Sequence, residues 1–169
     1  RSSIGRVSHL PVLRLAPVKE NRNNCPFLTE NHCAIHDAEP LVCALYPLAQ
    51  EISREGKVSY FLQPTACGGQ MIEAKVQDYL ARYDVPAREQ VDVYWAQTCM
   101  KLEDTVEQLE TMLDPVLVHR MQAKLWRALY FNYNDAEGFP PQLERNLRWL
   151  DDEFVKLAEY QRKLKNKSK

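Results

Sequence analysis

Residues 25–67 read CPFLTENHCAIHDAEPLVCALYPLAQEISREGKVSYFLQPTAC and hold four of the five cysteines of this 169-residue chain. Prolines stiffen the loops between these cysteines, and His32 and His36 lie beside the second one. Thiolate is a preferred ligand of zinc and of iron–sulfur clusters, and rigid loops suit a metal site because they hold several ligands in place. The candidate metal ligands are therefore Cys25, Cys33, Cys43 and Cys67.

Two alternatives to a metal site stay open for the clustered cysteines. Structural zinc sites commonly use close CxxC pairs, and none occurs here, so the cysteines could instead be small buried side chains. They could also form disulfide bonds in a secreted domain. An odd number of cysteines and no signal-peptide pattern disfavour disulfides, while burial does not explain why the cysteines cluster beside proline and glycine.

The composition is that of an ordinary soluble protein. Hydrophobic residues make up 45% of the chain and charged residues 27%, and the formal net charge is −1. This charge does not favour nucleic acid as a partner, and no apolar run reaches the roughly 18 residues that a membrane-spanning helix needs. We expect a cytoplasmic protein that binds an unidentified protein or small molecule, with no nucleic-acid or membrane partner.

Turn signals and periodicity predict one hairpin followed by helices. Residues 48–53 and 57–62 flank a turn at Gly56, a residue that adopts positive φ readily, and together they form a candidate β-hairpin. Beyond residue 70, apolar residues recur at spacings of three and four, which is typical of helices with one buried face. The predicted helices cover residues 72–83, 89–113, 115–133 and 142–164.

These elements predict a mainly α (α+β) fold in two parts. Residues 1–70 would form a cysteine-rich metal-binding lobe with a small β-hairpin, and residues 71–169 a bundle of three to four helices. A two-stranded hairpin alone is marginal in water, so metal would have to contribute to folding of the lobe. Cys99 lies within a helical stripe, where we expect a packed thiol and not a ligand.

The cysteine-rich stretch resembles the YkgJ-like cysteine-cluster family, which is described as zinc- or iron-chelating. The resemblance covers roughly residues 20–75. Family members also carry an upstream CxxCxxCC cluster that this chain lacks, and Glu39 and Ala44 replace two of their arginines. The matching segments are CPFL at 25–28, CAIH at 33–36, PLVC at 40–43, YP at 46–47 and the later Cys67.

The resemblance implies a metal-binding protein. Its cofactor would be an iron–sulfur cluster or a zinc ion, chelated by the four clustered thiolates. The same cysteine cluster also resembles part of the bacterial flagellin lysine-N-methylases. The alternative is therefore a metal-cluster-dependent enzyme with methylase-like or redox activity, for which the sequence indicates no catalytic residues.

Overall fold

The computed structural model describes residues 2–4, 9–13, 25–30, 32–38, 40–64 and 75–167. Over these residues the chain is mainly helical and contains small antiparallel hairpins, which confirms the predicted mainly α (α+β) class. The predicted cysteine-rich metal-binding lobe is not shown. None of the helices in the described ranges has the length and apolar content needed to cross a bilayer.

The strands form three two-stranded antiparallel sheets in the described residues. They pair as β1 (Ser2–Ile4) with β2 (Pro11–Leu13), β3 (Leu28–Thr29) with β4 (His32–Cys33), and β5 (Leu48–Ile52) with β6 (Val58–Leu62).

The helices follow the predicted periodicity. The predicted helices at 89–113, 115–133 and 142–164 correspond to α3, to α4 with η3, and to α5. A 3-10 helix, η2 (His36–Ala38), precedes these helices in the chain. The bounds are α1 (Leu41–Ala44), α2 (Val76–Arg82), α3 (Val85–Met112), α4 (Pro115–Trp126), the π-helix η3 (Arg127–Phe131) and α5 (Phe139–Lys167).

The chain packs as two compact units. Unit 1 comprises Arg1–Ala16 and Lys101–Lys169, and unit 2 comprises Pro17–Met100, so their boundary falls within α3. The boundary predicted between residues 70 and 71 lies outside the described residues and stays a prediction.

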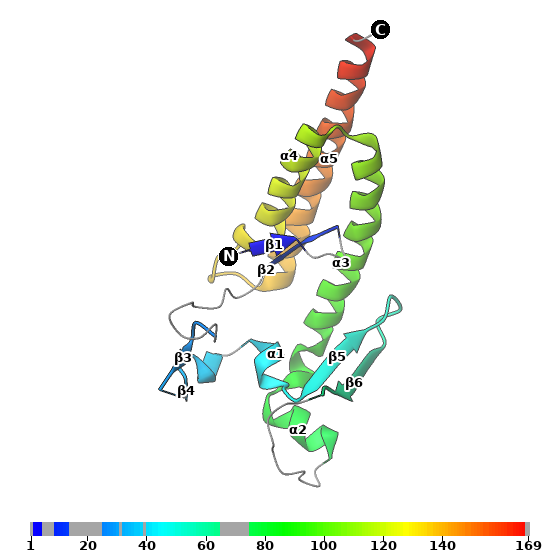
Figure 1. Cartoon of the computed structure of the whole chain (residues 1–169). Coiled ribbons are helices and arrows are strands. Elements are labelled where there is room, and N and C mark those ends of the chain that lie inside the picture. The colour runs from blue at the N-terminus through cyan, green and yellow to red at the C-terminus, as the bar shows by residue number, and fades with distance from the viewer. Residues whose placement is uncertain are drawn as a thin grey trace. The chain divides into compact units, whose positions relative to one another are not determined.

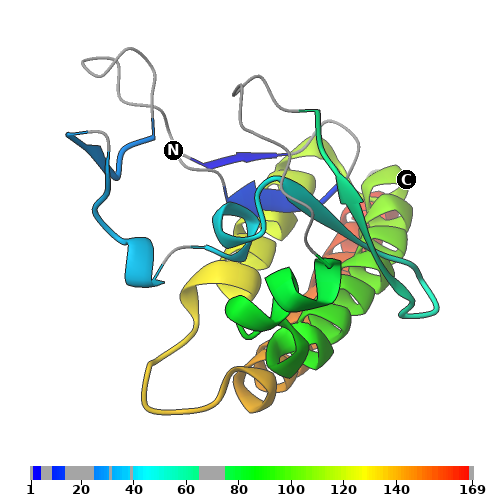
Figure 2. The same cartoon turned by 90° about the horizontal axis from the view of Figure 1, so that it is seen from below.

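In unit 2 the β5–β6 hairpin lies along the first half of α3 (Figure 2). Gly56 turns the hairpin with a φ of 81°, in the left-handed region that favours glycine. A Cβ at this position would lie 3.1 Å from Gln97 Nε2 and 3.2 Å from a methyl group of Val93. Gln97 also donates a hydrogen bond to the carbonyl of Arg54, so the tip of the hairpin is held against α3.

In unit 1, α4 and α5 run antiparallel and side by side (Figure 1). The buried face of α4 has a spacing of four residues, which keeps one stripe of a 3.6-residue helix turned inward. Several side chains that are at most 2% exposed lie at the centre of this unit, among them Leu117, Met121, Leu125, Leu143 and Leu150.

The turn between α3 and α4 has a conventional helix cap. Asp114 Oδ1 accepts hydrogen bonds from the amides of Val116 and Leu117, at 2.9 and 3.0 Å. Pro115 occupies the first helical position, where an amide proton is not needed. The amide of Asp114 donates to Gln161 Oε1 on α5, which ties the turn to the neighbouring helix.

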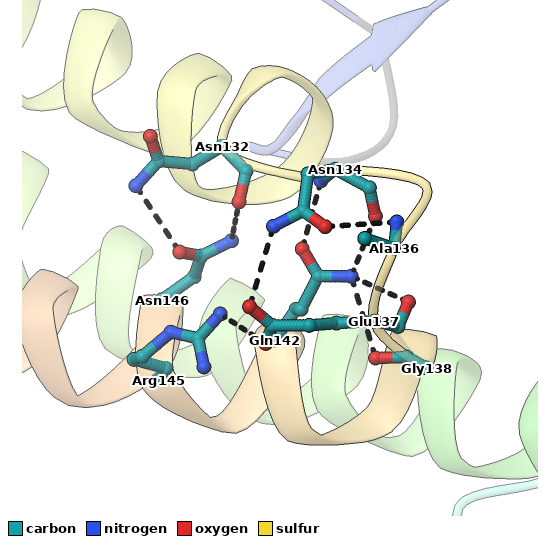
Figure 3. Close-up of polar contacts among 8 residues, drawn as sticks. All are labelled: Asn132, Asn134, Ala136, Glu137, Gly138, Gln142, Arg145 and Asn146. Carbon is teal, nitrogen blue, oxygen red and sulfur yellow. Dashed lines mark hydrogen bonds and ion pairs between the residues drawn. The ribbon is translucent and has the colours of Figure 1, made fainter.

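Two buried amide side chains of α5 hold the loop after η3 (Figure 3). Gln142, which is 2% exposed, accepts from the amide of Asn134 and donates to the carbonyls of Asn134 and Glu137. Asn146, which is 4% exposed, donates to the carbonyls of Ala128 and of Asn132. Side chains of α5 thus satisfy backbone groups of this loop and the carbonyl of the buried Ala128.

A charged contact between α4 and α5 predicts a defined acid sensitivity. Glu153 accepts hydrogen bonds from Lys124 and Lys156, which lower its pKa from 4.5 to about 2. A carboxylate with a lowered pKa contributes stability above the unfolded-state value and loses it as the pH falls through the folded-state value. We therefore expect the urea midpoint of the wild type to fall between about pH 4.5 and 2 by more than that of Glu153→Gln.

The advantage of the wild type over Glu153→Gln is expected to vanish near pH 2, and urea titrations at several pH values measure it. Glu144→Gln is the control, because Glu144 pairs with Arg148 only at 3.9 Å on the exposed face of the same helix. Parallel pH profiles for wild type and Glu153→Gln would contradict the assignment.

Candidate functional site

The structure describes three of the four predicted metal ligands, and all three are exposed. Cys25 precedes the β3–β4 hairpin, Cys33 lies in β4 opposite Leu28, and Cys43 lies in α1. The hydroxyl of Tyr79 on α2 lies 2.6 Å from the carbonyl oxygen of Tyr46, in the turn that follows α1. No disulfide joins the described cysteines, which include Cys99 on α3.

The predicted metal-chelating function is wrong for the part of the chain that the structure describes. No three His, Cys, Asp or Glu side chains there are placed to hold one metal ion. A zinc or iron–sulfur site needs several donors that converge at about 2.3 Å from the metal, and nearness in sequence does not ensure this convergence. The correction also covers the metal-dependent methylase-like or redox alternative.

Cys67 lies outside the described residues, so the complete four-cysteine ligand set is not tested. The choice between an iron–sulfur cluster and zinc likewise stays a prediction, as does the resemblance to the YkgJ-like family.

A polar cluster joins the β5–β6 hairpin to α3 in unit 2. The Tyr60 hydroxyl donates to Glu89 Oε2 at 3.0 Å and accepts from Gln50 Nε2 at 3.1 Å. Asp92 lies one turn after Glu89, and burial raises the pKa of its carboxyl above the usual value, with Arg88 opposing the rise. Burial also raises the pKa of the Tyr60 phenol.

This cluster has the features of a structural contact between the hairpin and α3. Its phenol and the Glu89 carboxylate are hydrogen-bonded to each other across two elements, so they hold the hairpin in place. The sequence pattern assigned no chemistry to these residues, and their pairing could not be read from their spacing.

The outer face of α4 and η3 carries a line of solvent-exposed side chains in unit 1. These residues follow each other at spacings of four, three, four and four, whereas the residues between them include the buried face of the helix. Both ends of the line are strongly exposed apolar side chains, at 64% for Val116 and 67% for Phe131. We call this line the outer row; it consists of Val116, Arg120, Ala123, Arg127 and Phe131.

The π-helix places Phe131 in the outer row. In an α-helix a step of four residues overshoots a full turn by roughly 40°, so successive steps of four drift around the helix. The wider turn of η3 reduces this drift between Arg127 and Phe131. The Ala128 carbonyl inside η3 accepts from Tyr133 at 3.0 Å and from Asn146 at 3.2 Å, which compensates for the altered helical bonding.

Aromatic rings surround the end of the outer row. Trp126 lies with its ring centroid 5.1 Å from that of Tyr130 and 6.1 Å from that of Phe131. Arg127 lies over the ring of Trp149, at 5.5 Å from the centroid. Tryptophan, tyrosine and arginine are the residue types that contribute most to the binding energy of protein interfaces.

The N-terminal strand β2 is attached beside this region in unit 1. The hydroxyl of Tyr130 donates to the carbonyl of Pro11 at 3.0 Å, and Gln122 donates to the carbonyl of His9 at 2.9 Å. The side chain of His9 contacts Glu110 at 2.5 Å, and this hydrogen bond raises the pKa of the imidazole above its usual value.

Comparison of the chain with protein-family models, with curated protein sequences and with solved structures finds no match. The interpretation of the outer row therefore depends on its own geometry and charge.

Proposed function

We propose that this protein is a protein-binding adaptor and that the outer row of α4 and η3 is its contact surface. The single observation that carries the proposal is the exposure of Val116 and Phe131 at the two ends of a continuous helical line. Exposed apolar side chains cost free energy in water, and a partner that covers both ends of the outer row would remove this apolar surface from water.

The dimensions of the outer row suit a segment of a partner protein. From Val116 to Phe131 the row covers fifteen steps of the helix, or roughly 22 Å at 1.5 Å per residue. That length matches about four turns of a partner helix laid along it. The cation–π contact of Arg127 with Trp149 and the ring contact of Phe131 with Trp126 orient both side chains before binding, which lowers the entropic cost of association.

The proposal includes a cytoplasmic location and a protein partner. The exposed thiols of Cys25 and Cys33 are consistent with a reducing compartment, because exposed cysteines outside disulfides persist there.

A peptide selection tests the proposal. The full chain is immobilised and used to enrich binders from a displayed library of random peptides, with Phe131→Ala protein as the counter-selection target. We expect enriched peptides whose affinity, measured by fluorescence anisotropy, falls at least about tenfold with Phe131→Ala or Val116→Ser, because a few side chains buried by the partner carry most of the binding energy of an interface.

The matched control is Val155→Ser, which removes another exposed valine from α5, outside the outer row. Circular dichroism verifies that each variant keeps its helical content. Failure to enrich any peptide, or equal binding by wild type and Phe131→Ala, would show that the outer row is not the contact surface.

A further inference from the structure

We infer that the partner segment is an acidic amphipathic helix that packs lengthwise along the outer row, an inference that rests on the proposed function. The first observation is the charge of this part of the chain. Residues 115–131 contain Arg120, Lys124 and Arg127 and no aspartate or glutamate. An electropositive surface favours a partner of negative charge.

Two of these three cations are not neutralised within the part of the chain that the structure describes. Lys124 pairs with Glu153 of α5. No described carboxylate forms an ion pair with Arg120 or Arg127, and both are exposed. Among the described residues, these two exposed guanidinium groups on one helix face therefore make no ion pair.

The setting of Arg127 favours carboxylate recognition. Its guanidinium group lies over the face of Trp149, at 5.5 Å from the ring centroid. A guanidinium group carries its N–H donors in one plane, in a fixed fork geometry. These donors suit the two oxygens of a carboxylate, which arginine binds with two parallel hydrogen bonds.

The spacing of the outer row points to a helix as the bound conformation. Arg120 and Arg127 are seven residues apart, and so are the apolar residues Val116 and Ala123. Seven residues is the heptad repeat with which two helices pack over several turns, with apolar residues along the seam and charged residues beside it. The small side chain of Ala123 at the middle of the row allows close approach of a second backbone.

The same pattern argues against a single-stranded nucleic acid. Such ligands require a groove whose cations follow the phosphates and aromatic faces that stack successive bases. Here apolar Val116 and Ala123 alternate with the two arginines, and the whole chain has a formal net charge of −1. A protein helix with alternating apolar and acidic positions is the better match.

Two synthetic probes test this inference. Each is a fluorescein-labelled helical peptide of three heptads with leucine at positions a and d; one carries glutamate at e and g, and the other carries lysine there. Fluorescence anisotropy with the full-length chain is expected to show at least about tenfold tighter binding of the glutamate peptide. The preference should decrease with added salt.

Charge reversal supplies the decisive comparison. Arg120→Glu is expected to lower the affinity for the glutamate peptide at least about tenfold and to raise the affinity for the lysine peptide. Arg162→Glu, which reverses another exposed arginine on α5, is the control and is expected to leave both affinities unchanged.

The outcomes separate this inference from the proposed function. Equal binding of both peptides, lost in Phe131→Ala, would overturn the acidic partner while supporting the contact surface. The same conclusion would follow if the library selection enriched peptides that need Phe131 but contain no excess of acidic residues. Failure of both peptides together with failure of the selection would overturn both proposals.

Two further measurements test whether the outer row binds a second copy of the chain or a nucleic acid. A dimer of the chain in multi-angle light scattering that Arg120→Glu dissociates would overturn the inference by assigning the surface to a second copy. Binding of a labelled oligouridylate, weakened by Arg120→Glu and without binding of the glutamate peptide, would overturn it in favour of nucleic acid.

Discussion

Replacement of Leu125 by alanine is expected to lower the free energy of unfolding by about 3 kcal/mol, the usual cost of truncating a fully buried leucine. Leu125 has no exposed surface and belongs to the inner face of α4. The substitution removes apolar contacts and leaves a cavity that neighbouring helices cannot close completely. Urea denaturation followed by circular dichroism measures the effect. The m-value, which is the slope of the unfolding free energy against urea concentration, is expected to stay unchanged.

Val155→Ala is the control for this measurement. Val155 is 58% exposed on α5, and substitutions of such residues change stability by less than about 0.5 kcal/mol. The comparison also tests whether Leu125 belongs to the buried core. Similar losses for both variants would contradict the assignment of Leu125 to the buried face.

Replacement of Gln142 by leucine is expected to lower the free energy of unfolding by a similar amount, about 3 kcal/mol. The leucine can neither accept from the amide of Asn134 nor donate to the carbonyls of Asn134 and Glu137 (Figure 3). Each of these three hydrogen bonds contributes about 1 kcal/mol of net stability. Urea denaturation measures the loss, and amide hydrogen exchange of Asn134 should accelerate at the same time.

Gln142→Glu separates packing from hydrogen bonding. Glutamate has nearly the same shape and can still accept from the amide of Asn134, but its carboxylate cannot donate to the surrounding carbonyls. We expect it to destabilise the protein as well, whereas Gln108→Leu on the exposed face of α3 should have little effect. Wild-type stability in both Gln142 variants would show that this network does not stabilise the fold.

Much of the helical architecture could be predicted from local sequence. The spacing of apolar residues indicated α3, α4 and α5, and Pro115 correctly marked the start of α4, where Asp114 caps the helix. Gly56 indicated the hairpin turn because its positive φ is a local requirement. Signals of this kind depend on a few neighbouring residues, so the local structure that they predict does not depend on long-range packing.

The metal site could not be inferred reliably from clustering. Cys33 and Cys43 are ten residues apart in sequence, yet one lies in β4 and the other in α1. Whether thiolates converge depends on the path of the backbone between them, which cysteine spacing without close CxxC pairs does not determine. The described segments did not bring them together into a metal-binding group.

The outer row was not predicted from the sequence, although two of its features are visible there. The absence of acidic residues between 115 and 131 and the seven-residue spacing of Arg120 and Arg127 are visible in the sequence. The position of Phe131 is not, because it depends on the π-helix η3 and on Asn146, whose side chain reaches the Ala128 carbonyl from α5. Long-range hydrogen bonds of this kind override local periodicity.

Chemical-shift mapping of isotope-labelled full-length protein locates the contact surface residue by residue. The protein is titrated with a peptide enriched in the selection, and backbone and methyl shifts are followed at each addition. Binding along the outer row should produce the largest changes at Val116, Ala123 and Phe131, with the β5–β6 hairpin unaffected. Largest changes on that hairpin, with shifts of the outer row unchanged at saturation, would contradict the proposed contact surface.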